Sequence, residues 1–146
     1  MSERAERALE NFSRGYNCSQ AVLEVFAGEL GFGEEQALKI ASGFGGGVGR
    51  GGQICGAVTG AVMVLGLKYM LTDEEPAIAK PRVYLKVKEF TDRFKEESRS
   101  IICRELLGFD ISTEEGAAEI EARNLHSTVC SGLVEKTVEI LEEMME

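Results

Sequence analysis

Residues 42–60 read SGFGGGVGRGGQICGAVTG and hold nine of the 17 glycines of the chain, together with one of its four cysteines. Glycine costs about 0.5 to 1 kcal/mol relative to alanine inside regular structure, so this density is tolerated only where the backbone bends unusually or approaches another group closely. The first half of the segment is therefore predicted to be a loop. We expect the chemistry of the protein to lie beside it.

An apolar run, ICGAVTGAVMVLGLKYML, occupies residues 54–71 and contains only Thr59 and Lys68 as clearly polar side chains. This pattern predicts a helix that is buried on most of its surface. The run reaches the lower limit for a membrane span, and Gly56 and Gly60 have the spacing of small residues in packed membrane helices. Because the other predicted helices are amphipathic and need a central apolar partner, we predict a buried core helix and no membrane span.

The glycine-rich loop resembles two nucleotide-binding motifs, and neither fits its context. Gly47, Gly49 and Gly52 match the spacing of the dinucleotide fingerprint, but the preceding residues EEQALKIASG have a helical pattern and no strand feeds the loop. The phosphate loop of nucleotide hydrolases ends in Gly-Lys-Ser/Thr, and no Gly-Lys pair occurs in the chain. The sequence therefore argues against both kinds of site.

Length and charge limit the class of protein. The 146 residues fit a single domain, residues 1–146, which is long enough to bury about two thirds of the surface of the unfolded chain. The N-terminal residues MSERAERALENF lack the apolar stretch of a signal peptide, so we expect a cytoplasmic protein whose cysteines are thiols, ligands or redox centres. A formal net charge of −9 argues against nucleic acid and anionic membranes as partners.

Apolar residues recur at helical spacing through the rest of the chain. The predicted stripes are Ala5, Ala8, Leu9 and Phe12; Val22, Val25, Phe26 and Leu30; Ala37, Ile40, Ala41 and Phe44; Val83, Val87, Phe90 and Phe94; and Val134, Val138, Leu141 and Met145. Residues 72–81, bracketed by Pro76 and Pro81, are predicted to be a connector. A short helix over residues 101–107 is predicted to end at Gly108. No segment alternates as a strand does, so we predict an all-α helical bundle around the buried helix.

Each of the four cysteines is predicted to lie in the first turn of a helix. They are Cys18, Cys55, Cys103 and Cys130. Asn17 and Gln20 form a capping box around Cys18, and a serine stands three residues before Cys103 and before Cys130. The positive end of a helix lowers the pKa of a thiol and makes it a better nucleophile, electron donor or ligand. The plainer alternative is that each cysteine is a small apolar core residue.

A similar capping pattern, Ser112 followed by Glu115, predicts the start of an acidic helix before the last one.

The cysteine spacing excludes several familiar arrangements. The chain has no paired C-x-x-C knuckles of structural zinc, no ferredoxin run and no thioredoxin-type C-x-x-C. Each cysteine would instead arrive from a different helix end. We predict that the four meet at one site beneath the glycine loop.

These features resemble the redox-active protein family named for its C_GCAxxG_C_C cysteine pattern. The hallmark C-G-A-x-x-G occurs at residues 55–60, with Cys18 upstream and Cys103 and Cys130 downstream. The segments GYNCSQAV and CRELLG are also similar to the family, and the resemblance covers nearly the whole chain. It implies a four-cysteine redox or metal-binding role and leaves the substrate open.

Three functions therefore stay open. In the first, the four thiolates hold an iron–sulfur cluster or zinc and serve electron transfer. In the second, pairs of cysteines cycle between dithiol and disulfide as a thiol–disulfide oxidoreductase without a cofactor. In the third, the chain is a helical binding module with structural cysteines. The redox partner is a protein or small molecule of unknown identity, and a homodimer is left open.

Residues beside the cysteines are predicted to hold a cofactor or small ligand: Gly46, Gly47, Gly49, Arg50 and Gly56. Cys55 has no capping side chain before it, so loop N–H groups are free to face its sulfur, and we predict that its pKa is the lowest of the four. His126, the only histidine, is predicted to be a polar surface residue.

Overall fold

Eight α-helices make up the fold in the computed structural model, which describes all residues from Met1 to Glu146. They are α1 (Glu3–Ser13), α2 (Cys18–Ala27), α3 (Glu34–Ala41), α4 (Gly56–Tyr69), α5 (Pro76–Ser98), α6 (Cys103–Leu107), α7 (Glu114–Ala122) and α8 (Ser131–Met144). The only β feature is an isolated antiparallel bridge between Ile54 and Ile102. The all-α prediction is confirmed.

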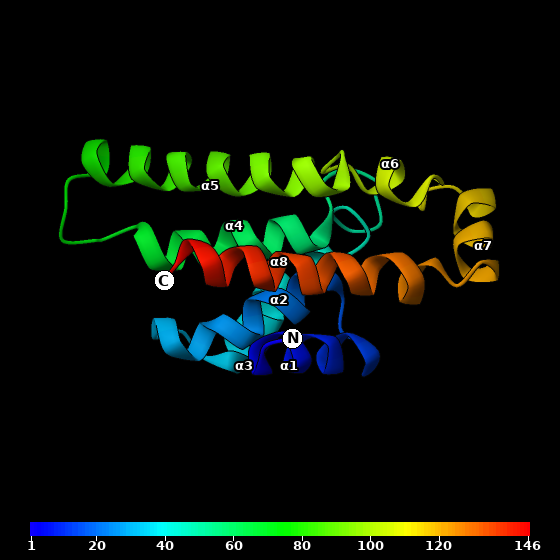
Figure 1. Cartoon of the computed structure of the whole chain (residues 1–146), viewed down its shortest axis with the longest axis horizontal. Coiled ribbons are helices and arrows are strands. Elements are labelled where there is room, and N and C mark those ends of the chain that lie inside the picture. The colour runs from blue at the N-terminus through cyan, green and yellow to red at the C-terminus, as the bar shows by residue number, and fades with distance from the viewer.

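The central position belongs to α4, which contacts α2, α5 and α8. Figure 1 shows α5, α4 and α8 side by side along the long axis of the molecule, with α1 and α3 on the side away from α5 and α7 at one end. The buried side chains of α4 include Ala57, Ala61, Val64 and Leu65, all at 0% exposure, so the predicted core helix is confirmed. No helix combines the length and the apolar character that crossing a bilayer requires.

The two glycines of the C-G-A-x-x-G motif let α4 approach α2 closely. A Cβ atom on Gly60 would lie 2.9 Å from the Ser19 carbonyl oxygen and 3.0 Å from Val22 Cβ. A Cβ atom on Gly56 would lie 3.1 Å from Cys18 Cβ. Because real Cβ contacts are rarely so short, only glycine allows this packing. The close contact places Cys18 against the first turn of α4.

The predicted connector between Pro76 and Pro81 is wrong, because α5 begins at Pro76 and continues through Pro81. Proline at the first helical position sacrifices no hydrogen bond, which makes Pro76 a helix start rather than a break. Pro81 lies in the second turn of this 23-residue helix, which is held by Phe90 and Phe94, both fully buried. Ile40, placed on a buried stripe by its spacing, is 53% exposed.

Other helix ends differ from prediction by one or two residues. Helix α4 begins at Gly56 rather than residue 54, because Cys55 has extended backbone and acts as the N-cap. Helix α6 begins at Cys103 rather than residue 101 and ends at Leu107, with Gly108 as its left-handed C-cap, as predicted for its end. Helix α7 is capped by Thr113, whose hydroxyl accepts the Gly116 N–H, whereas the Ser112 hydroxyl donates to Asp110. Two adjacent hydroxyl residues can each cap a helix, and the sequence alone does not choose between them.

Candidate functional site

All four cysteines line one small cavity. Its volume is about 30 Å³, and its walls are formed by Cys18, Cys55, Cys103, Cys130, Gly46, Gly47, Gly56, Leu106, Leu107, Ile111, His126 and Leu133. The cavity lies where the main hydrophobic core, which includes Cys55, meets a smaller cluster that includes Cys103 and Cys130. Cys18 packs against both clusters. The structure thus brings together residues that are far apart in the sequence, and all four thiols are free.

The first cysteine is positioned by a helix cap. Cys18 is the first residue of α2, and the Asn17 side chain accepts the Gln20 N–H at 2.9 Å. The Gln20 side chain in turn accepts the Asn17 N–H at 2.9 Å, which completes the predicted capping box. This reciprocal arrangement fixes the start of α2 and with it the backbone of Cys18.

Main-chain hydrogen bonds hold the second and third cysteines next to each other. The Cys55 N–H donates to the Ile101 carbonyl at 2.8 Å, and the Cys103 N–H donates to the Gln53 carbonyl at 2.6 Å. A Cβ atom on Gly47 would lie 2.8 Å from Cys103 Cβ, so the glycine loop presses directly on this pair. Gly47 and Gly56, predicted as ligand-binding residues, therefore both have a packing reason to be glycine.

The fourth cysteine departs from prediction. Cys130 ends a π-helical turn, His126–Cys130, that continues directly into α8. It therefore lies within a continuous helical segment, and the prediction that it occupies a first helical turn is wrong. Ser127 makes no capping hydrogen bond. Single π turns are uncommon and often mark functional sites, because they redirect the side chains that flank them.

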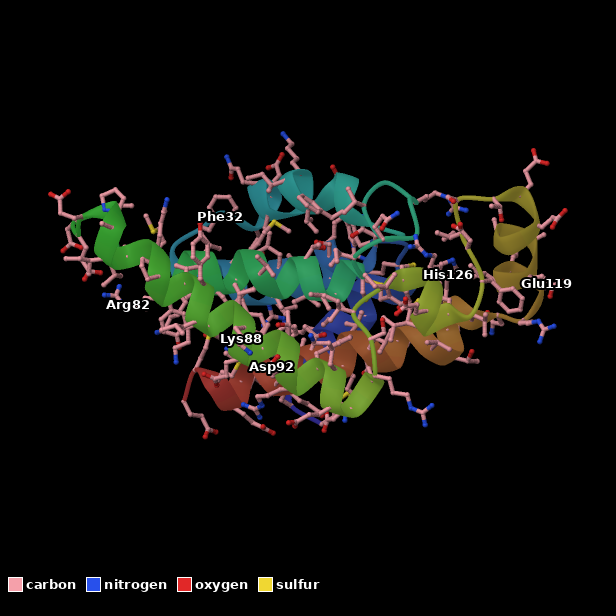
Figure 2. All side chains as sticks on the ribbon, turned by 90° about the horizontal axis from the view of Figure 1, so that it is seen from above. Phe32, Arg82, Lys88, Asp92, Glu119 and His126 are labelled. Carbon is pink, nitrogen blue, oxygen red and sulfur yellow. The ribbon has the colours of Figure 1, made fainter.

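The π turn places a histidine against the fourth cysteine. His126 Nδ1 lies 3.8 Å from Cys130 Sγ. Figure 2 shows His126 at the end of the molecule where α6 and the glycine loop come together. The sequence contained a signal for this contact, because His126 and Cys130 are four residues apart and such pairs are neighbours on a helix. His126 is exposed, as predicted for a surface residue, and its contact with Cys130 is the feature that this prediction missed.

Cys18 and Cys130 both line the cavity, and each changes the pKa of the other. Hydrogen bonding from the Cys18 thiol is the main cause that lowers the pKa of Cys130 to about 6. Burial opposes the shift, and the hydrogen bond and charge of His126 add to it. The pKa of Cys18 is raised well above its ordinary value, because the bond and burial both hold its proton. The pair thus keeps its negative charge on Cys130.

The other two thiols are protonated at neutral pH. Burial raises the pKa of Cys55 to about 12, although the N–H groups of Ala57 and Val58 oppose the shift. Burial also raises the pKa of Cys103 to about 11. The prediction that Cys55 has the lowest pKa of the four is therefore wrong. Loss of hydration at the end of a buried helix outweighs the free N–H groups that this prediction relied on.

A pH titration tests the charge on Cys130. A lowered pKa means that the thiolate predominates above the lowered value, so the ultraviolet absorbance of one thiolate should appear through a midpoint near pH 6. Cys130→Ser should remove this transition. Cys18→Ala should move the midpoint upward by more than His126→Asn does, because the Cys18 hydrogen bond is the larger cause. A transition at or above the unperturbed value of about 8.5 in the unaltered protein contradicts the arrangement.

The four cysteines offer the ligand atoms that a soft metal prefers, but the cavity between them is small. Four thiols are the donor set that zinc and iron–sulfur clusters prefer. A cavity of about 30 Å³ has room for an ion or a water molecule, whereas a cluster of several iron and sulfur atoms requires the walls to move. No three His, Cys, Asp or Glu side chains are arranged to hold a metal ion. Binding would also displace the protons of Cys55 and Cys103.

A larger pocket adjoins the cysteine cavity. This outer pocket has a volume of about 850 Å³ and is lined by Leu9, Phe12, Ser13, Gly15, Tyr16, Asn17, Cys18, Ser42, Gly45, Gly46, Gly49, Arg50, Ile111, His126, Ser127 and Ser131. Cys18, Gly46, Ile111 and His126 line both spaces. Of the predicted ligand-binding residues, Gly46, Gly49 and Arg50 therefore face the outer pocket, and Gly47 and Gly56 face only the cavity.

Comparison with known proteins assigns the chain to a family. The family described as "Putative redox-active protein (C_GCAxxG_C_C)" matches residues 16–144, which include all four cysteines and His126. No curated protein and no solved structure matches the chain. Because the family match covers nearly the whole sequence and its pattern cysteines are those that line the cavity, the chain belongs to the C_GCAxxG_C_C redox-active family.

Proposed function

We propose that the protein is a thiol–disulfide oxidoreductase in which Cys130 is the nucleophile and Cys18 the resolving cysteine. The geometry that carries this proposal is the small cavity that Cys18 and Cys130 line together, with His126 Nδ1 3.8 Å from the Cys130 sulfur. A thiolate is the attacking species in disulfide exchange, and an adjacent thiol is the group that completes it. The low pKa of Cys130 supports the assignment of roles.

The reaction balances with the protons already at the site. The Cys130 thiolate attacks one sulfur of a substrate disulfide R–S–S–R, a mixed disulfide forms, and the first RS⁻ leaves with the proton of the His126 imidazolium. The Cys18 sulfur then attacks the Cys130 sulfur of the mixed disulfide, and the second RS⁻ leaves with the Cys18 proton. Two electrons pass to the substrate, which becomes two RSH, and the protein holds a Cys18–Cys130 disulfide. A thiol reductant restores the dithiol by the reverse exchange.

Disulfide mapping tests this pairing. Fully reduced, metal-free protein is mixed with one equivalent of bis(2-hydroxyethyl) disulfide, quenched with acid, alkylated and digested for mass spectrometry. We expect a Cys18–Cys130 disulfide to form first, because both residues line the same small cavity and Cys130 has the lowered pKa. Cys55 and Cys103 should stay alkylated, because their protonated thiols attack slowly. A first disulfide that includes Cys55 or Cys103 contradicts the proposal.

Convergence of four thiols supports a second candidate, a metal site for electron transfer. A dithiol mechanism leaves Cys55 and Cys103 without a chemical role, whereas an iron–sulfur cluster or a zinc ion would employ all four thiols. Iron, zinc and acid-labile sulfide should be measured in protein purified without oxygen. Stoichiometric metal that is lost when any one cysteine becomes serine favours this candidate. Exchange activity that persists after treatment with a chelator favours the dithiol.

A further inference from the structure

The outer pocket is basic in an acidic protein. The chain carries 25 Asp and Glu residues and a formal net charge of −9, yet none of the 16 residues that line the pocket is acidic. Two of them, Arg50 and His126, are basic, and the pKa of His126 is raised by its hydrogen bond to Cys130. Opposite charge concentrated in a concave site raises the local concentration of ligands that complement it. This pocket therefore favours an anion.

Arg50 is free to bind such an anion. Its side chain forms no ion pair with any of the acidic residues and makes no hydrogen bond within the protein. A guanidinium presents a planar set of N–H donors that matches a carboxylate. The same pocket is lined by Cys18 and His126, so this unpaired arginine can hold a ligand beside the proposed resolving cysteine.

The glycine loop adds main-chain donors to the same wall. Five successive residues, 46–50, have φ between 56° and 72°, and two of them, Val48 and Arg50, are not glycine. Left-handed backbone costs a non-glycine residue about 1 to 2 kcal/mol, so the surrounding structure must hold Val48 and Arg50 in this unfavourable conformation. The N–H groups of Gly46 and Gly49, which line the pocket, donate to no main-chain carbonyl. Successive N–H groups in such turns form concavities that bind anions.

We propose that the outer pocket selects small disulfides that carry carboxylate groups, with the carboxylate held by Arg50 and the loop N–H groups and the disulfide next to His126. This inference rests on the proposed exchange activity and names its substrate class. A volume of about 850 Å³ is within the range of small-molecule sites. Cys130 is only 7% exposed and lines the adjoining cavity, which meets this pocket at Cys18 and His126. A folded protein cannot enter that space. A low-molecular-weight disulfide fits it, and the products are two carboxylated thiols.

Three disulfides of similar size and different charge provide the test. They are 3,3′-dithiodipropionate, which is anionic, bis(2-hydroxyethyl) disulfide, which is neutral, and cystamine, which is cationic. For each disulfide, the rate of Cys18–Cys130 disulfide formation is measured at low ionic strength. That rate is divided by the rate at which the same disulfide reacts with a small free thiol, and the quotient is the corrected rate. We expect the corrected rate of the anion to exceed that of the cation by about tenfold or more, and added salt to reduce the difference.

Variants assign the preference to Arg50. Arg50→Gln should remove most of the preference for the anion, measured within each variant as the ratio of the corrected rates of the anionic and neutral disulfides, and Arg50→Lys should retain part of it. Arg7→Gln is the matched control, because Arg7 is exposed on α1, outside the pocket lining, and its loss changes the net charge equally. Equal corrected rates for the three disulfides, or a preference that survives Arg50→Gln, overturn the proposed selection of carboxylated disulfides. Neither result contradicts the proposed exchange activity. If no disulfide yields the Cys18–Cys130 bond, both proposals fail.

Discussion

Cys130→Ser is expected to abolish oxidation of the protein by small disulfides, with a fall in rate on the order of a thousandfold or more. Serine is nearly isosteric with cysteine, but its hydroxyl is not ionised at neutral pH and does not attack sulfur. The remaining thiols, which are held by burial or by a hydrogen bond at a raised pKa, cannot replace it. Loss of thiols should be followed by acid quench and mass spectrometry over time.

Two further serine variants separate the roles within the cavity. Cys18→Ser should trap a mixed disulfide on Cys130, detected as an added mass of one substrate half, because the resolving sulfur is missing. Cys103→Ser is the matched control: it makes the same substitution in the same cavity and should leave exchange nearly unchanged. If Cys103→Ser is as damaging as Cys130→Ser, and metal is lost with it, the metal-centre function explains the site better than the dithiol does.

Gly60→Leu is expected to destabilise the fold by about 3 kcal/mol or more, a large part of the 5 to 15 kcal/mol typical of a domain. The first added carbon already lies 2.9 Å from the Ser19 carbonyl oxygen and 3.0 Å from Val22 Cβ. A leucine side chain would force α2 and α4 apart, and Cys18 would move with α2. Urea unfolding followed by circular dichroism measures the change.

Gly66→Leu controls for the effect of adding the same side chain to α4. A Cβ atom on Gly66 meets nothing within 4 Å, so this variant should unfold near the unaltered midpoint or above it, since leucine favours helix over glycine. Gly60→Leu with an unchanged midpoint is the result that speaks against the close packing of α2 and α4.

The helices followed from the sequence because burial on one face leaves a periodic pattern. Examples are the apolar run of α4 and the stripe of α8. In that stripe Val134, Val138 and Leu141 are all buried. Pro81 was misjudged for the opposite reason. A local rule about proline ignores the energy of packing Phe90 and Phe94 farther along α5, and that packing determines whether the helix continues.

The position of the site was predictable from the sequence, and its electrostatics were not. Helix starts placed Cys18, Cys55 and Cys103, whereas Cys130 reaches the same cavity from within a continuous helical segment. Which sulfur carries the charge depends on the balance between dehydration and hydrogen bonds, and that balance needs three-dimensional distances. The spacing of four residues makes His126 and Cys130 candidate neighbours, whereas the π turn that contains them leaves no trace in hydrophobic periodicity.

The π turn also separates the residues that surround Cys130 from the buried face of α8, which a regular helix would hold in one register. A π turn differs from an α-helical turn by one inserted residue, so deletion of one residue there would rotate everything upstream by about 100° relative to α8. The buried face of α8 begins beyond the turn, at Val134, and would stay in register. Deletion of one residue in the turn should therefore displace His126 from Cys130 and raise the pKa of that thiol, while the packing of α8 from Val134 onward is retained.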